Sequence, residues 1–382
     1  RLMLRPIKRG MWIRLPIMDT NPNRGITVGV MPIWVIKEAG GERIKHIHAP
    51  SVTYNSYFSV TPTYRYYLYP ADDSALVARG SIAKYEKELM GHYEDSSFAG
   101  TAYDTLLRVQ FNQDAGRRFF GIGPDTPRDA ESNYKEDYYQ LKMGWGTPLY
   151  QDSRWRVHVN DRLLSQKIGN GPLKGFTGFS ARFPGVAPAH RMQSNELRLT
   201  VDFDSRDHAT TPTAGAFLQI FREHSFRGLA SSFDYSRTGF DGRYFQPWKM
   251  KKRQVSAIGL RFEQLNGPTP PFWLLPSLGG KYALRAYGEG RYIDRSMVTI
   301  NAEQRFTVWD VKMAGVSTEF EVAPFIGVGT VADTLDRMSK RYARPVMGVG
   351  TRAVARPQVV GSVDVGIGQE GLAIFMDINY SF

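Results

Sequence analysis

The residues of this chain that could do chemistry are few and scattered. Cysteine is absent, which excludes a thiolate nucleophile, a disulfide and a cysteine-ligated metal. His46 and His48 share one face of a predicted strand and could bind a metal weakly, but two unrelated histidines explain the pattern better. Ser180 and His190 fall in one predicted loop, and such spacing does not bring a nucleophile and its base together. These residues predict neither a metal site nor an enzyme.

A glycine-rich stretch near the end of the chain reads GIGQEG, from Gly366 to Gly371. It matches the G-x-G-x-x-G pattern of dinucleotide-binding proteins, in which the motif follows a strand and opens a helix. Here the stretch lies between two predicted strands, so it predicts a hairpin. No cofactor is expected.

The elements that must position any functional residue are strands. Gly accounts for 37 of the 382 residues and Tyr for 20, while aromatic residues make up 13% of the chain, a mixture typical of strands and tight turns. The longest strongly apolar run, residues 26–36, is too short for a membrane-spanning helix, which needs about 20 residues. The length suits one large barrel.

The formal net charge of +12 raises the question of an anionic partner. Apart from one short cluster, KMKKR at residues 249–253, the basic residues are scattered, and no DNA-recognition helix accompanies them. No nucleic acid is therefore expected. Anionic lipids of a membrane surface, lipopolysaccharide included, are expected partners, and well-solvated loops explain the charge equally well.

Short segments of alternating apolar and polar residues, bounded by turn residues, recur along the chain. They predict an all-β fold, a sixteen-stranded antiparallel transmembrane β-barrel with a strand number that is even, as in bacterial barrels. The predicted strands are 25–37, 46–58, 60–70, 75–93, 101–113, 133–146, 154–168, 195–205, 214–224, 231–246, 252–266, 297–309, 318–332, 345–356, 357–368 and 371–382. Residues 1–24 are expected to be a short lead segment, and residues 25–382 the barrel.

Two regularities support a barrel in the bacterial outer membrane. The long links follow odd-numbered strands and should therefore lie at one end; they are Asn112–Ser132, Gly169–Ser194, Gly267–Ser296 and Asp333–Arg344. In strand 297–309, Val298 and Ile300 oppose Glu303 and other polar residues, which predicts an apolar outside and a charged lumen.

The final stretch, GLAIFMDINYSF, places Tyr380 and Phe382 on its apolar face. A sheet in lipid must pair all its backbone groups, so this strand is expected to close the barrel against strand 25–37. Pro32 removes one ladder donor from that strand. The seam between first and last strands is therefore predicted to be weak.

Four stretches together resemble the BamA/TamA family of outer-membrane assembly factors, in the Omp-eighty-five (bacterial surface antigen) superfamily. They are FFGIGPDT at 119–126, DSRDHATTPTAG at 204–215, LGGKYALRAYGEGRY at 278–292 and the terminal strand. In the second stretch, the family turn motif D-x-R-D…P-T-x-G falls on Asp204, Arg206, Asp207 and Gly215. Residues 1–24 are too short for a POTRA repeat, so the sequence resembles a barrel-only branch.

The resemblance implies that the long loop folds into the lumen and that its tip carries Arg285 and Tyr287. A buried arginine needs carboxylate partners, because an unpaired buried charge is costly. By strand parity, Glu303 and Glu321 face the lumen and are the expected partners. Glycines on lumen-facing positions of the last strands should leave room for the loop; they are Gly327, Gly329, Gly348, Gly350, Gly366 and Gly368.

The function implied by the resemblance is assistance to polypeptides that insert into, or cross, the outer membrane through the weak seam. Client or accessory outer-membrane proteins would then be partners. Two alternatives stay open at this point: a pore or channel, and a barrel that anchors a larger outer-membrane complex.

Overall fold

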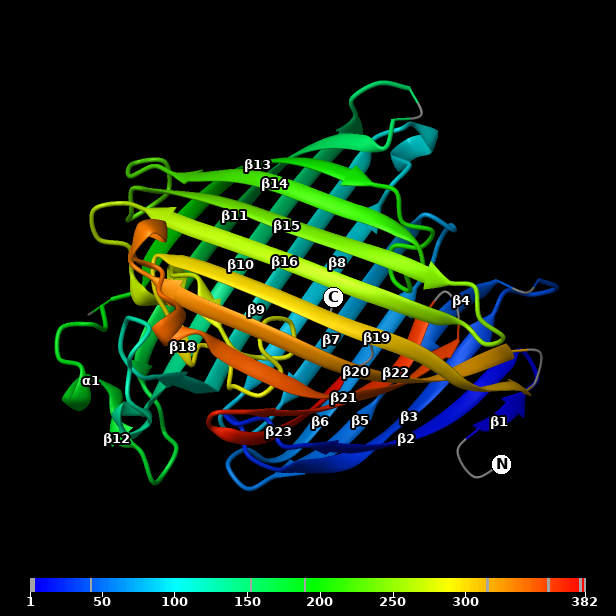
Figure 1. Cartoon of the computed structure of the whole chain (residues 1–382), viewed down its shortest axis with the longest axis horizontal. Helices are drawn as coiled ribbons and strands as arrows, with labels where there is room; N and C mark the ends of the chain where they lie inside the picture. Colours follow the sequence, from blue (N-terminus) through cyan, green and yellow to red (C-terminus); the bar gives the residue numbers. More distant parts are fainter. Residues whose placement is uncertain are drawn as a thin grey trace.

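Antiparallel strands, tilted around a common axis, make up most of this computed structural model (Figure 1). The structure describes residues 4–41, 43–151, 153–188, 190–313, 316–355, 358–377 and Tyr380. Within these ranges, no helix has the length and hydrophobicity needed to cross a membrane. One sheet of 21 strands forms the wall, and β17 pairs with β18 in a separate small sheet.

Except for the two-residue strand Thr177–Gly178, which pairs in parallel with the strand that begins at Ser132, the strands of the wall follow the chain order, with short 3-10 turns and one short helix in the links. The strands are β1 Leu4–Ile7, β2 Gly10–Asp19, β3 Thr27–Lys37, β4 Ile44–His48, β5 Ser51–Asn55, β6 Ser59–Leu68, β7 Ser74–Ile82, β8 Lys87–Asp95, β9 Asp104–Phe119, β10 Ser132–Pro148, β11 Trp155–Asn170, β12 Thr177–Gly178, β13 Met192–Asp204, β14 Gly215–Ser225, β15 Tyr235–Trp248, β16 Gln254–Asn266, β17 Ser277–Leu278, β18 Tyr292–Ile293, β19 Ser296–Met313, β20 Val316–Ala332, β21 Arg344–Ala355, β22 Gln358–Gly368 and β23 Gly371–Asp377. The helical segments are η1 Phe98–Gly100, η2 Arg128–Ala130, α1 Phe179–Arg182, η3 Phe272–Leu274, η4 Leu335–Arg337 and η5 Lys340–Tyr342.

The sixteen predicted ranges are not all reproduced. The range 75–93 is two strands, β7 and β8, joined by a turn in which the Ala83 amide donates to the Glu86 carbonyl at 2.7 Å. The turn has no glycine, proline or asparagine, so no typical turn residue marks it in the sequence.

The predicted strand 46–58 is interrupted at Ala49 and Pro50 and forms β4 and β5. Both pair with β3, and the stretch of β3 that contains Pro32 lies between the two pairings. Proline has no backbone N–H to donate. Because the neighbouring strand is interrupted opposite Pro32, no hydrogen bond from that position is required. Pro32 is therefore accommodated inside the sheet rather than at its edge.

The seam also lies elsewhere than expected. Residues 10–19, within the expected lead segment, form β2 and pair with the whole length of β3. The last strand, β23, therefore meets β2 and not strand 25–37. The sequence missed β2 because its inward residues Met11 and Ile13 are apolar and pack with Ile33 of β3 and Ile47 of β4, whereas strands such as β19 turn charged residues inward.

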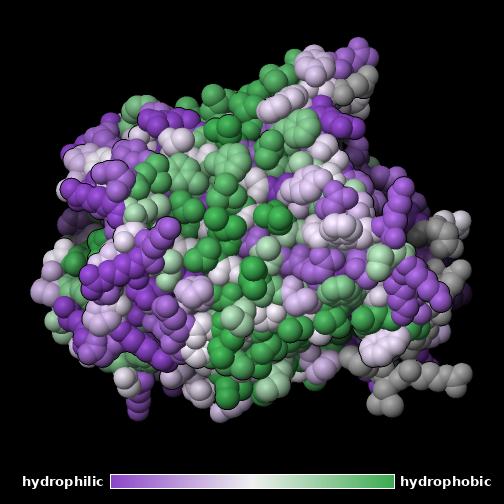
Figure 2. Space-filling view, viewed as in Figure 1, coloured by the Kyte–Doolittle hydropathy of each residue, from purple (hydrophilic) through white to green (hydrophobic). Residues whose placement is uncertain are grey.

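Elsewhere the two faces of the wall follow the predicted alternation. Leu197, Leu199 and Ile300 are exposed on the outside. Glu303 and Arg305, from the same strand as Ile300, are buried inside. Figure 2 shows the apolar side chains gathered in a band across the wall, with polar residues toward both ends. Such a band is what a lipid-facing barrel surface requires.

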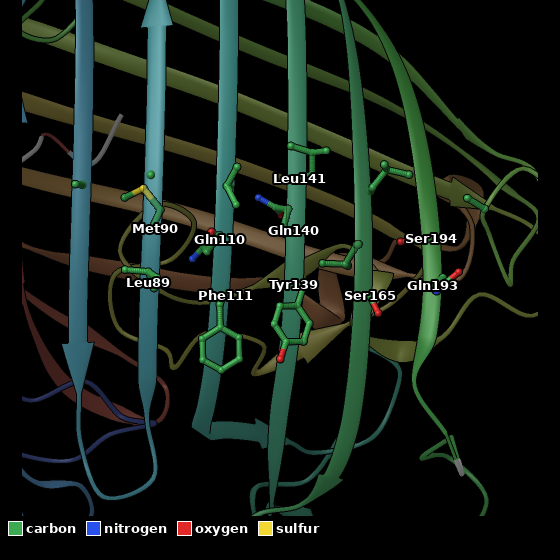
Figure 3. Close-up of a pocket in the computed structure, with 16 residues that line it drawn as sticks. Leu89, Met90, Gln110, Phe111, Tyr139, Gln140, Leu141, Ser165, Gln193 and Ser194 are labelled. Carbon is green, nitrogen blue, oxygen red and sulfur yellow. The ribbon is translucent and has the colours of Figure 1, made fainter.

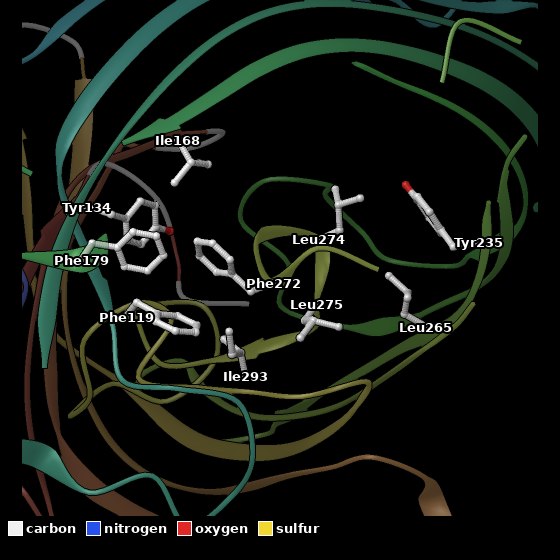
Figure 4. Close-up of a cluster of buried hydrophobic side chains, with 10 residues drawn as sticks. All are labelled: Phe119, Tyr134, Ile168, Phe179, Tyr235, Leu265, Phe272, Leu274, Leu275 and Ile293. Atoms are coloured by element: carbon white, nitrogen blue, oxygen red, sulfur yellow. The ribbon is translucent and has the colours of Figure 1, made fainter. Parts of the chain in front are cut away.

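The long links gather at one end of the wall, as predicted, and there they close the lumen with an apolar core. Phe119, Tyr134, Phe179 and Phe272 pack ring against ring, with the Phe119 and Phe272 centroids 4.5 Å apart (Figure 4). Leu274 and the other members come from the link between β16 and β19 and from strand ends. This core, called the lumen cap below, is the largest buried apolar cluster described.

Candidate functional site

The link between β16 and β19, residues 267–295, runs into the barrel and carries Arg285 at its tip. The tip is a compact turn, in which the Gly280 amide donates to the Tyr287 carbonyl at 2.8 Å and the Ala286 amide donates to Leu284 at 2.8 Å. Leu278 and Leu284 are fully buried against the wall. The prediction that this loop folds into the lumen agrees with these contacts.

Arg285 is 1% exposed, so its charge depends on protein partners. Its Nη1 lies 2.9 Å from Glu303 Oε2 and 3.4 Å from Asp364 Oδ1. The guanidinium also stacks on Phe325, 3.6 Å from the ring centroid. The tip is thereby tied to three strands at once, β19, β20 and β22.

Two further arginines complete this arrangement. Arg305 Nε lies 2.7 Å from Glu303 Oε1, and Arg352 Nη2 lies 2.8 Å from Asp364 Oδ1 and 3.4 Å from Glu303 Oε2. We call Arg285, Glu303, Arg305, Arg352 and Asp364 the lumen cluster. Three guanidinium groups share two carboxylates, and Glu303 contacts all three arginines. Charged hydrogen bonds of this kind are the strong ones.

Of the two predicted partners of Arg285, the structure brings Glu303 to it. Glu321 lies on the lumen face, but its Oε2 accepts a hydrogen bond from the Tyr380 hydroxyl at 2.8 Å. Asp364, on β22, holds the second position beside Arg285. Parity along β22 could have named Asp364, but the register that sets it beside the loop is not readable from the sequence.

Tyr380 lies inside the barrel rather than on its outer face. Strand β23 ends at Asp377, and the buried Tyr380 ring lies under the Arg305 guanidinium at 3.9 Å. The expectation that Tyr380 closes the barrel from its apolar face therefore does not hold. Its hydroxyl and its ring face give it partners on the lumen side that the alternation of the strand did not reveal. Phe382 lies outside the described residues.

Tyr287 and Gly366 show how closely the tip approaches the wall. The Gln369 amide donates to the Tyr287 hydroxyl at 3.2 Å, and burial raises the pKa of that phenol. A Cβ on Gly366 would lie 1.9 Å from the Arg285 carbonyl oxygen. Only glycine fits beneath the loop at that point, as the sequence predicted for the lumen-facing glycines.

The family turn motif joins β13 to β14 at the end of the barrel opposite the lumen cap. Asp204 binds the Arg206 guanidinium through both oxygens, and Asp207 accepts from the Thr213 and Ala214 amides at 2.8 and 3.1 Å. Gly215 has a φ of 98°, and a Cβ there would meet the Ser205 carbonyl at 2.2 Å. The turn is therefore rigid.

This turn also contacts the lumen cluster. Arg305 Nη1 donates to the Pro212 carbonyl at 3.0 Å, so one guanidinium joins the turn to Glu303 and Tyr380. The sequence identified the turn and the loop separately, and the structure connects them. A polar cavity of about 450 Å³ lies beside this contact and is lined in part by Arg206, Asn301 and Tyr380.

The loop is fixed to the opposite wall as well. Beyond the tip, Glu289 Oε1 lies 2.8 Å from Arg117 Nη1 on β9, and its carbonyl accepts from Asn23 Nδ2 at 2.7 Å. Asn23 belongs to the turn between β2 and β3, next to the seam. The long loop thus spans the lumen from the last strands to the first.

The histidines do not assemble a metal centre. His46 and His48 lie on the outer face, where their Nδ1 atoms contact the hydroxyls of Tyr66 and Tyr64 at 2.8 and 2.6 Å. No cluster of three or more His, Asp or Glu residues suited to a metal occurs in the part of the chain that the structure describes. The site is a set of ion pairs that holds a loop in place.

Comparisons with known proteins give the arrangement a context. The Omp85 superfamily domain matches residues 74–356. A crystal structure of BamA from Haemophilus ducreyi, lacking POTRA domains 1–3, aligns with a TM-score of 0.58 at 16% identity and covers 94% of this chain and 74% of that one. CdiB from Acinetobacter baumannii aligns with a TM-score of 0.50 at 12% identity, and the alignment covers 96% of this chain and 59% of CdiB. No curated protein sequence matches.

Proposed function

Because this chain belongs to the Omp85 superfamily of outer-membrane β-barrels, we propose that it assists polypeptides to insert into, or cross, that membrane through the seam between β2 and β23. One observation carries the proposal: the loop inside the barrel is held by buried ion pairs, whereas the seam is held by few backbone contacts. Movement is therefore easiest at the seam.

The seam contacts are largely made by side chains. The Thr20 amide donates to the Ile374 carbonyl at 3.1 Å, while the Ile374 amide turns to the Thr20 hydroxyl at 2.9 Å. The Met376 amide donates to Asp19 Oδ2 at 3.3 Å. Among the described residues, no ladder of paired residues joins β2 to β23. Both strands therefore retain edges that another strand can use.

The mechanism follows from those edges and needs no catalytic residue. A client strand adds to the exposed edge through main-chain hydrogen bonds, as in other cases of β-augmentation. The lumen cluster and the Glu289–Arg117 pair keep the loop across the lumen meanwhile. The barrel thus opens at the seam without losing its interior packing.

The runner-up, an open pore, fits the lumen poorly. The lumen cap and the inserted loop obstruct the end where the long links gather. Single-channel recording distinguishes the two functions: low basal conductance that rises after deletion of residues 270–290 fits an obstructed barrel, and high basal conductance fits a channel. Co-purification with a partner in fixed ratio would instead favour the anchor.

The proposed function is tested with the purified barrel in lipid vesicles. A urea-denatured outer-membrane barrel polypeptide is diluted into vesicles with and without the protein, and folded client is scored as the heat-modifiable band on a gel. The expected result is faster client folding in the loaded vesicles. Equal rates in loaded and empty vesicles would contradict insertion as the function.

A further inference from the structure

The outer face of the wall from β8 to β13 carries three rows of residues that lie in register. Nearest the long links, Lys87, Gln113, Asp137 and Lys167 face one another across four strands. The next row contains Leu89, Phe111, Tyr139, Ser165 and Gln193, and the third contains Gly91, Val109, Leu141 and Leu163. Polarity therefore falls in steps away from the loops.

A groove of about 810 Å³ runs between the second and third rows (Figure 3). Leu89, Val109 and Phe111 give it apolar walls, and Tyr139 lies beside Phe111 with ring centroids 5.1 Å apart. Gly91 adds no side chain to the groove, and a Cβ at that position would point into open space, with nothing within 4 Å. A groove of this composition on a lipid-facing wall accommodates acyl chains.

Cations lie beside the groove, between it and the long links. Arg191 projects across β11, where its Nη1 donates to the Ser165 carbonyl at 2.8 Å and its guanidinium lies 5.1 Å from the Tyr139 centroid. Lys167 is exposed, and Lys135 pairs with Asp137 at 3.3 Å. With Lys87, four cations therefore face a single carboxylate.

Cations on a lipid-facing wall require anionic partners, because hydrocarbon cannot solvate them. At the boundary of the apolar band those partners are lipid headgroups, and basic side chains there select anionic ones. The charged groups extend from Lys87 on β8 to β11, which carries Lys167 and which the Arg191 guanidinium overlies. They therefore cover three strand spacings, or roughly 14 Å. One phosphate cannot contact cations so widely spaced, whereas a lipid with two separated phosphates and several chains can.

We propose that this surface binds a lipid of the leaflet on the long-link side that carries two separated phosphates and several acyl chains. Its chains occupy the groove along Leu89, Val109 and Phe111, and its phosphates contact Lys167, Arg191 and Lys87. The site is independent of the seam and of the proposed function. It also lies apart from the basic residues of the loops, which are beyond the apolar band.

The test measures lipid retained by the purified, detergent-solubilised protein in native mass spectrometry. The probes are bisphosphorylated lipid A, phosphatidylglycerol and phosphatidylethanolamine. Lys167→Gln with Arg191→Gln removes two headgroup contacts, and Gly91→Leu fills the groove without changing charge. Lys249→Gln with Lys251→Gln, in the turn between β15 and β16 at the opposite end, is the matched control.

Lipid A is expected to bind most tightly, about thirtyfold more weakly after loss of the two cations. Gly91→Leu is expected to weaken all acylated probes, with the heat-modifiable fold intact, and the control is expected to bind as wild type. Equal loss in the control, or no loss in either variant, would reduce the surface to ordinary lipid contact and overturn the site. Equal affinity for phosphatidylglycerol, which has one phosphate, would overturn the assignment to a lipid with two separated phosphates.

Discussion

Replacement of Glu303 by glutamine is expected to destabilise the barrel more than replacement of any of its arginine partners. The change leaves three buried guanidinium groups with Asp364 as the one remaining carboxylate of the cluster. Removing one partner of a buried ion pair costs about 3–5 kcal/mol, because the other charge stays desolvated. The measurement is the urea midpoint of unfolding, followed by tryptophan fluorescence in vesicles.

Arg285→Ala is the matched comparison, because it leaves two arginines with two carboxylates. It is expected to free the loop to protease while lowering the urea midpoint less than Glu303→Gln does. If Glu303→Gln unfolds like wild type, or if the loop of Arg285→Ala stays protected, the lumen cluster does not hold the loop. Glu303→Asp is also expected to be less stable than wild type, since the shorter side chain cannot reach all three arginines.

Gly366→Val is expected to displace the loop by steric means alone. Its Cβ would lie 1.9 Å from the Arg285 carbonyl oxygen, and a backbone atom cannot rotate out of the way as a side chain can. Overpacking of this kind costs about 1–3 kcal/mol. The expected readout is higher single-channel conductance together with protease cleavage in residues 280–290.

Gly169→Val provides the control for this change. Gly169 is also in a strand of the wall, β11, but a Cβ there would meet nothing within 4 Å. The control is expected to conduct like wild type. Wild-type conductance and an intact loop in Gly366→Val would show that the loop and wall are not in the close contact described.

Much of the fold was predictable because alternation has a physical cause. Lipid on one side and water or ions on the other force a period of two, as in strand β19, where Ile300 faces out and Glu303 faces in. The long loop and the turn at Asp204 were identified by their motifs. The resemblance placed Arg285 at the tip of that loop, and the cost of a buried charge then required carboxylates nearby.

What the sequence did not predict depends on register. Glu321 and Glu303 both face the lumen, but β19 pairs Glu303 with Phe325, on which Arg285 stacks. Glu321 lies four residues farther along β20, or about 13 Å at the usual strand rise. Strand β2 was missed for a related reason: its inward face meets an apolar cluster, so its pattern is the reverse of a polar-lined lumen.

The central claim, that client strands use the seam, is tested most directly by locking it. Met18→Cys with Met376→Cys places a disulfide between β2 and β23, where the Met18 amide already contacts Met376 Sδ at 2.9 Å. The chain has no other cysteine, so the bond can form only there within one molecule. The oxidised protein is predicted to lose its acceleration of client folding in vesicles and to regain it on reduction. Full acceleration in the oxidised form would contradict the account.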